Sequence, residues 1–185
     1  MAAIAVAPPL ERLIQENLEL FTQLHQRSHD EETKRLAIVA SKGTLDMVYP
    51  PLILASTAAA MGMEAGVFFT FYGLNTLHRK KNRRLQVAPL ANPAAPVPVP
   101  NILGAIPGMT FIATRMLKWM MGRQRMPTVH ELLKVCQDSG VKLIACSTTM
   151  GVMGVKESDL IDGVDIAGAA SFLEFASKAH VTLFV

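Results

Sequence analysis

The chain has 185 residues, of which 50% are hydrophobic and 18% charged, so it is long enough and apolar enough to bury the core of one domain. This composition excludes a disordered or low-complexity protein. Two cysteines are too few for a disulfide scaffold, and the first residues lack the basic segment of a secretory signal peptide, so we expect a reducing, cytoplasmic setting.

The positive charge is concentrated in one stretch of the chain. Residues 73–130 hold nine Lys or Arg and no acidic residue, which gives this stretch a net charge of +9. The other residues hold nine basic and fifteen acidic ones, which gives them a net charge of −6. Such asymmetry favours an anionic partner, either nucleic acid, a membrane surface or an acidic protein face. Nucleic acid is the least favoured, because the basic run 79–84 lacks the interleaved aromatic residues that stack on bases.

The first half of the chain predicts two helices and two strands. The apolar spacing over 10–26 predicts an amphipathic helix, and the short continuous apolar run 36–40 is typical of a strand buried on both faces. A second helix is expected over 44–62, although two prolines near its front could displace its start. A second buried strand is expected over 66–72, with Gly73 turning the chain out at its carboxyl end.

Residues 74–127 then interrupt the alternation and are interpreted as an insertion. The proline-rich stretch 93–100 favours extended polyproline II conformation. The apolar end of the insertion, 102–121, contains Arg115 and Lys118, which make it a poor membrane-spanning helix. We expect a helix that is soluble or buried in an oligomer. An interfacial amphipathic helix and a true span are the alternatives.

After the insertion the alternation resumes. The elements expected there are a helix over 128–139 opened by a Thr128–Glu131 capping box, a strand over 142–146, a short helix over 150–155, an acidic loop over 159–165, a helix over 167–179 and a last strand over 181–185. Strands that alternate with helices predict an α/β fold with a parallel sheet and right-handed crossovers.

The candidate site follows from the predicted sheet. Ligands of an open α/β sheet bind outside the carboxyl ends of the strands, and those ends carry residues 41–43, 72–75 and 146–149. Cys146 is the sharpest feature among them, because a thiol before a Ser-Thr-Thr turn can be activated by helix amides and nearby cations that lower its pKa. The alternative is that Cys146 is a small buried hydrophobic residue, and the residues alone leave the two open.

Cys136 lies ten residues earlier, on the predicted helix that precedes this strand. A core-facing thiol is the favoured interpretation. If the end of that helix folded back over the strand end, however, Cys136 could act as a resolving or relaying thiol for Cys146. There is no CxxC spacing, which disfavours a dithiol of the thioredoxin type.

Other chemistry has little support in the sequence. The five histidines show no metal-ligand spacing, and the glycines show no nucleotide-binding pattern, so we expect no metal and no cofactor, although a flavin could still bind such a sheet. Ser147, Thr148 and Thr149 lack His and Asp partners and are expected to act as caps and hydroxyl donors around the cysteine rather than as nucleophiles.

Residues 143–155, with the run Cys-Ser-Thr-Thr-Met, and residues 161–173 resemble the DsrE/DsrF/DsrH-like family. The resemblance is strongest to a branch once labelled peroxiredoxin-like, whose soluble members accompany sulfur-oxidation systems. Residues 41–46 and 69–74 match it as well, so the resemblance extends from about 36 to 185. It implies a flavodoxin-like three-layer α/β subunit, homo-oligomeric, that carries sulfane sulfur as a cysteine persulfide.

The resemblance also implies residue roles and partners. The persulfide-carrying cysteine of the family maps onto Cys146, and a second cysteine of its soluble members maps onto Cys136. Partners would be small TusA-type sulfur carriers and rhodanese-type donors. Some relatives have membrane spans in the insertion, which Arg115 and Lys118 interrupt here, so contact with a membrane surface stays open.

We therefore expect an N-terminal helix and linker over 1–35 and a DsrE-like domain over 36–185, with the insertion 74–127. The expected function is that of a cytoplasmic sulfur carrier or sulfurtransferase using Cys146. Lys42 and Asn75 lie at the same sheet edge and are expected to stabilise the thiolate or persulfide. The alternatives are a non-catalytic adaptor at a membrane surface or in a protein complex, with inert cysteines, and, more weakly, a thiol peroxidase.

Overall fold

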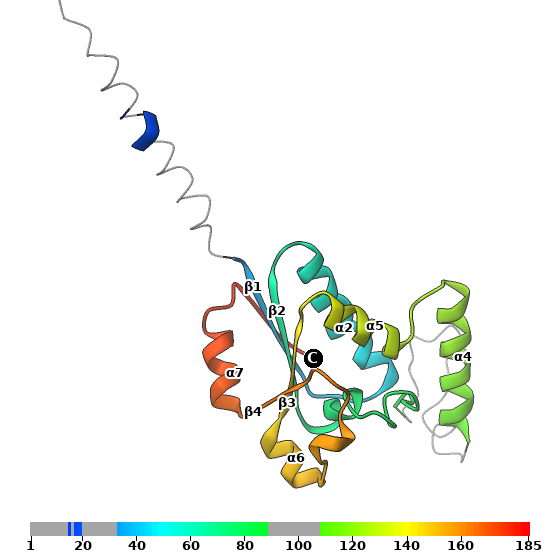
Figure 1. Cartoon of the computed structure of the whole chain (residues 1–185). Coiled ribbons are helices and arrows are strands. Elements are labelled where there is room, and N and C mark those ends of the chain that lie inside the picture. Colours follow the sequence, from blue (N-terminus) through cyan, green and yellow to red (C-terminus); the bar gives the residue numbers. More distant parts are fainter. Residues whose placement is uncertain (1–14, 16, 20–32, 89–107) are drawn as a thin grey trace, which may run out of the picture. The chain divides into compact units, whose positions relative to one another are not determined.

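The structure is a computed structural model that describes residues 15, 17–19, 33–88 and 108–185 (Figure 1). The chain divides into two units, Met1–Thr33 and Lys34–Val185. In the first unit the described residues 15 and 17–19 are helical, in agreement with the predicted helix. The rest of that helix and the polyproline stretch 93–100 lie outside the described residues.

The second unit is built on a parallel sheet, as predicted. Its described strands pair in the order β4-β3-β2-β1-β5, and every pair is parallel. The strands are β1 (Arg35–Ala40), β2 (Glu64–Phe69), β3 (Lys142–Cys146), β4 (Asp165–Ala167) and β5 (Val181–Phe184). The three central strands are nearly continuous buried runs, which requires cover on both faces of the sheet.

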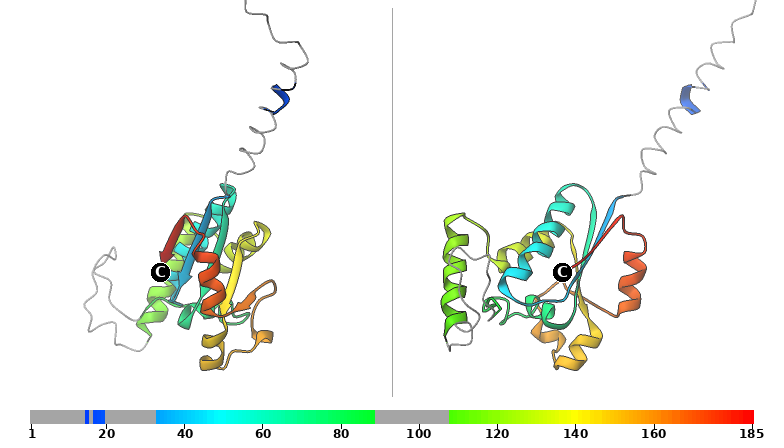
Figure 2. Two further views of the ribbon diagram at one scale, coloured as in Figure 1. Left: turned by 90° about the vertical axis from the view of Figure 1, so that its left-hand side faces the viewer. Right: turned by 180° about the vertical axis from the view of Figure 1, so that it is seen from behind.

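Helices supply that cover and complete three layers. Figures 1 and 2 show α2 (Leu45–Ala60) and α5 (Val129–Asp138) on one face and α7 (Ala169–Ala176) on the other. The chain moves in one direction across the sheet from β1 through β2 and β3 to β4, and then returns to the opposite edge for β5. Right-handed crossovers travelling in opposite directions place their helices on opposite faces, which explains the position of α7. The predicted three-layer α/β fold is confirmed.

The alternation of side chains along the strands divides the core into two clusters. In β3, Leu143 and Ala145 belong to the cluster under α2 and α5, whereas Ile144 and Cys146 belong to the cluster under α7. The second cluster is closed by Phe172 of α7, whose ring stacks on Phe68 with the centroids 4.8 Å apart. Burying an aromatic or large aliphatic side chain in this way stabilises the fold by about 1.5–3 kcal/mol.

The predicted end of the second strand was wrong. β2 ends at Phe69, and the short 3₁₀ helix η1 (Phe71–Thr76) follows where strand had been expected to continue to residue 72. Phe71 adopts the left-handed conformation with φ 45°, which ends the extended chain. Gly73 therefore lies inside η1 rather than at a strand exit.

The elements after β3 also differ from their predicted bounds. The helix α6 (Ser147–Met153) begins directly after the strand, so the expected Ser-Thr-Thr turn is its first turn. The expected acidic loop over 159–165 is entered from the 3₁₀ turn η2 (Glu157–Asp159). Residues 165–167, expected as a loop end and a helix start, form β4 beside β3, and α7 begins at Ala169. A three-residue strand is too short to produce a recognisable pattern.

Three other expectations are confirmed. The helix expected over 44–62 is α2, and the prolines at 50 and 51, which could have displaced its start, lie inside it. Thr128 and Glu131 form the predicted capping box of α5, and the last strand is β5.

The described end of the insertion forms α4 (Met109–Arg123). Its inner side is attached by Thr114, whose buried hydroxyl accepts from the Val87 N–H at 3.2 Å, and by packing of Leu117 and Met121 against the core. Its outer side exposes Phe111, Ile112, Met116, Trp119 and Met120. Within the described ranges, none of the helices combines the length and the apolar character that a membrane span needs.

Candidate active site at the carboxyl edge of the sheet

Cys146 lies where β3 passes directly into α6. It is the last residue of the strand and the N-cap of the helix, so its sulfur lies beside the first N–H groups of α6. The side chain is 6% exposed and belongs to the cluster under α7. The carboxyl edge of the sheet therefore holds a nearly buried thiol against the start of a helix.

Two threonines surround this thiol. The register pairs Phe69 with Ala145, which brings Thr70 of the neighbouring strand end alongside Cys146. The Oγ1 atoms of Thr70 and Thr149 are 3.0 Å apart, and Thr149 Oγ1 also accepts a hydrogen bond from the Phe71 N–H at 3.2 Å. Thr149 is 5% exposed, so its hydroxyl is held in one position by the chain around it.

These groups make the thiol more acidic than an ordinary cysteine. Burial by itself raises the pKa of Cys146, but hydrogen bonds from the hydroxyl and the N–H of Thr149 act against it. The Thr70 hydroxyl and the Thr148 N–H act in the same direction, and the net pKa of Cys146 is lowered. Because the thiolate is the nucleophilic form, the site favours attack by sulfur.

Sequence reasoning found part of this arrangement. Thr149 is placed as the expected hydroxyl donor, whereas Thr148 contributes its N–H and, like Ser147, has an exposed side chain on the first turn of α6. Thr70 was missed. The signal that could have found it is its position at the end of the neighbouring predicted strand, since the carboxyl ends of parallel strands share one edge.

Lys42 and Asn75 are at the same edge but are not joined to the thiol. Among the residues that the structure describes, no hydrogen bond or ion pair links either of them to Cys146. Lys42 is exposed after β1. The Asn75 amide is directed toward Gly43, since a Cβ placed on Gly43 would lie 3.4 Å from the Asn75 Nδ2.

A basic hollow of about 400 Å³ lies beside these residues, lined by Gly43, Asn75, Lys80, Lys81, Arg84, Leu85 and Gln86. None of its three cations has an ion pair within the described part of the chain. The hollow and the thiol are on adjoining loops, because Gly43 packs against the backbone of Tyr72 and Phe71 bonds to Thr149.

Cys136 is in a different environment. It is fully buried in the cluster under α2 and α5, its thiol donates to the Leu52 carbonyl at 3.5 Å, and burial raises its pKa to about 11. Cys146 belongs to the cluster on the other face of the sheet. In this conformation the sheet therefore separates the two sulfurs, and they cannot exchange a sulfur atom directly.

An α/β subunit with a nearly buried cysteine at the end of its third strand, beside the start of a helix, is the class of protein that the fold and the site define. The family model of the DsrE/DsrF/DrsH-like family matches residues 32–184. The chain belongs to this family, which confirms the resemblance noted from its motifs.

Individual proteins are similar to most of this chain. The chain is 47% identical over 160 residues to a protein of Allochromatium vinosum named sulfur carrier protein DsrE2, an alignment that covers 83% of this chain and 99% of that protein. It is 32% identical over 158 residues to the uncharacterised protein YrkE of Bacillus subtilis, with 84% and 99% covered. Among solved structures, the YchN protein of Escherichia coli superposes with a TM-score of 0.49 at 13% identity, over 82% of this chain and 99% of that one.

Proposed function

We propose that this protein is a sulfur carrier that accepts sulfane sulfur as a persulfide on Cys146 and passes it to partner proteins. The name of the A. vinosum relative supports a role in sulfur trafficking. The observation that carries the assignment to one residue is the position of Cys146 at the carboxyl edge of the sheet, between the end of β3 and the start of α6 and beside the hydroxyl pair of Thr70 and Thr149, where its pKa is lowered.

The proposed reaction is an exchange at sulfur. The Cys146 thiolate attacks the outer sulfur of a donor persulfide, a new S–S bond forms at Cys146, and the S–S bond of the donor breaks with its electron pair leaving on the donor thiolate. In the second step the thiolate of an acceptor protein attacks the outer sulfur of the Cys146 persulfide. The sulfur passes to the acceptor, and Cys146 is left as a thiolate. The donors from Thr70 and Thr149 that stabilise the thiolate are also placed to receive the anion that remains after transfer.

The proposed partners are small TusA-type carriers and rhodanese-type donors. The basic hollow supports an acidic docking face on the partner, because unpaired Lys80, Lys81 and Arg84 would attract it and steer its approach to the same edge as the thiol. We also propose a homo-oligomer in a reducing cytoplasm. Both cysteines are free thiols, which suits that compartment.

The test is the intact mass of the protein after incubation with a persulfide donor. Wild type is expected to gain the mass of one sulfur atom, and a thiol reductant should remove it. Cys146→Ser should not load, whereas Cys136→Ser should load as wild type does. A folded wild-type protein that stays unloaded with several donors, or equal loading of Cys146→Ser, would contradict the proposal.

A further inference from the structure

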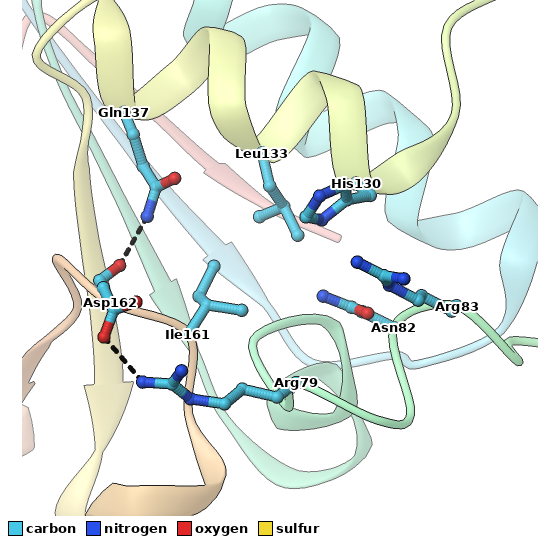
Figure 3. A pocket seen from close by; sticks show the side chains of 8 residues that line it. All are labelled: Arg79, Asn82, Arg83, His130, Leu133, Gln137, Ile161 and Asp162. Carbon is cyan, nitrogen blue, oxygen red and sulfur yellow. Dashed lines mark hydrogen bonds and ion pairs between the residues drawn. The ribbon is translucent and has the colours of Figure 1, made fainter.

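A second pocket, of about 280 Å³, lies apart from the reactive thiol on the α5 side of the sheet. It is formed by Arg79, Asn82 and Arg83, by one side of α5 and by residues 161 and 162 (Figure 3). The segments on two of its sides are tied together, since His78 pairs with Leu160 and the Arg79 N–H donates to the Asp159 carbonyl at 2.8 Å. The pocket is therefore a built part of the fold.

Asn82 is the residue that this fold leaves unexplained. Its side chain is at the pocket, the residue is only 4% exposed, and neither its Nδ2 nor its Oδ1 has a hydrogen-bond partner within the described residues. A buried amide has lost its bonds to bulk water, and such groups are nearly always paired. An amide with both a donor and an acceptor unpaired, directed into a pocket, indicates a ligand that supplies the complementary pair.

The charges around the pocket indicate the sign of that ligand. Arg79 is already engaged, because it donates to the Leu160 carbonyl and pairs with Asp162 at 2.6 Å. Asp162 is held in place by Gln137, whose Nε2 donates to its carbonyl at 2.5 Å. Arg83 has no ion pair among the described residues, so it leaves an unbalanced guanidinium at the pocket.

We propose that this pocket binds a small carboxylate that also carries an amide. The carboxylate would pair with the fork of Arg83, and the amide would exchange two hydrogen bonds with Asn82. Figure 3 shows the side chains of Arg83 and Asn82 close together, with His130 and Leu133 above them and Ile161 opposite. Leu133 and Ile161 provide an apolar wall for the body of the ligand. The site uses neither cysteine and is independent of the proposed sulfur chemistry.

The first experiment is a titration of the ¹⁵N-labelled full-length protein with N-acetylglycine, followed by NMR. Saturable shifts are expected in residues 79–83 and in α5. Acetate lacks the amide and N-acetylglycinamide lacks the charge, so each should bind at least tenfold more weakly. Inorganic phosphate should also bind at least tenfold more weakly. The absence of saturable shifts with N-acetylglycine, or tighter binding of any of the other three probes, would overturn the proposal.

Variants then test the residues. Arg83→Gln should weaken N-acetylglycine binding at least tenfold, whereas Arg84→Gln, a neighbouring cation that lines the other hollow, should bind as wild type does. Equal weakening in both would show a diffuse charge effect and contradict the site. Cys146→Ser should bind as wild type does, so this result does not depend on sulfur loading.

The variant Asn82→Leu tests whether the Asn82 amide binds a ligand or stabilises the fold. Because the amide has no partner within the described fold, its replacement by an apolar side chain should leave the thermal midpoint equal to or above that of wild type while N-acetylglycine binding is lost. A large fall in the midpoint, or binding that survives in Asn82→Leu, would show that Asn82 serves the fold instead. Asn82→Ser provides a smaller second variant, expected to fold and to bind at least tenfold more weakly.

Discussion

At the scale of single residues, the Thr149 hydroxyl is the main group that lowers the pKa of Cys146 against the effect of burial. Removing it in Thr149→Val should raise the pKa of Cys146, because burial would then be opposed by fewer donors. The thiolate fraction at pH 7 would fall, by about tenfold for each unit of pKa. We expect slower alkylation of Cys146 by iodoacetamide at neutral pH and a rate profile whose midpoint moves to higher pH.

Thr148→Val is the matched control for that experiment. Thr148 acts through its N–H, which the substitution keeps, and its side chain is exposed. Its pH profile should coincide with that of wild type. Equal displacement of both profiles would show that the β-branched substitution disturbs α6 and that the Thr149 hydroxyl is not the cause.

Cys136 carries a different prediction because its thiol is fully buried and its pKa is raised to about 11. Cys136→Ala should lower the free energy of unfolding by about 1–2 kcal/mol through the small cavity it leaves. Sulfur loading of Cys146 should be unchanged. Chemical denaturation and intact mass measure the two effects, and slower transfer out of Cys146 at unchanged stability would instead indicate a relay.

Of the residues around Cys146, only those in the same segment of the chain could be predicted from the sequence. The run 146–149 places the thiol and Thr149 together, because a strand end and a helix start are adjacent in the chain. Thr70 and the Phe71 N–H come from a distant segment, and their contact depends on strand register. The two unpaired atoms of Asn82 depend on packing, which no local pattern reports.

At the scale of elements, the carboxyl edge depends on close backbone packing between the loop after β1 and η1. A Cβ on Gly73 would lie 2.2 Å from the Ala40 carbonyl oxygen, so Gly73→Ala must push η1 away from the sheet. We expect a loss of about 3 kcal/mol in unfolding free energy. Because η1 also carries the Phe71 N–H bonded to Thr149, alkylation of Cys146 should slow as well.

Gly151→Ala is the control for this glycine prediction. Gly151 lies inside α6, and a Cβ added to it would meet no neighbouring atom within 4 Å among the described residues, so alanine should stabilise the protein by about 0.5–1 kcal/mol. Thermal unfolding of the two variants should therefore shift in opposite directions. A neutral Gly73→Ala would show that η1 can move freely.

The ends of helices and strands could be predicted where a local sequence signal is strong. They could not be predicted where contacts with distant segments determine them. The capping box set the start of α5, and a continuous apolar run set β1. The end of β2 depends on the left-handed Phe71, and β4 is stabilised only by pairing with β3. Neither feature has a sequence period of its own.

At the scale of the whole molecule, α4 is the feature that the fold does not account for. It exposes five large apolar side chains, and two of its arginines lie over its aromatic rings, Arg115 over Phe111 and Arg123 over Trp119, at 5.8 and 5.0 Å from the ring centroids. An apolar surface of this kind usually marks an interaction site. Its position within the basic part of the chain leaves two candidates, a second copy of the chain and an anionic membrane.

The homo-oligomer proposal predicts that α4 is buried between subunits. Wild type should then scatter light as a multimer, and the double variant Ile112→Lys/Met116→Lys, which charges one side of α4, should become monomeric while keeping its helical circular dichroism. Val152→Lys, at an exposed apolar position on α6, should remain multimeric. If wild type is instead monomeric and floats with phosphatidylserine vesicles, and the double variant does not, then α4 meets a membrane surface. In that case Arg115, Lys118 and Arg123 of α4 would serve lipid attachment, and the docking of an acidic carrier would depend on Lys80, Lys81 and Arg84.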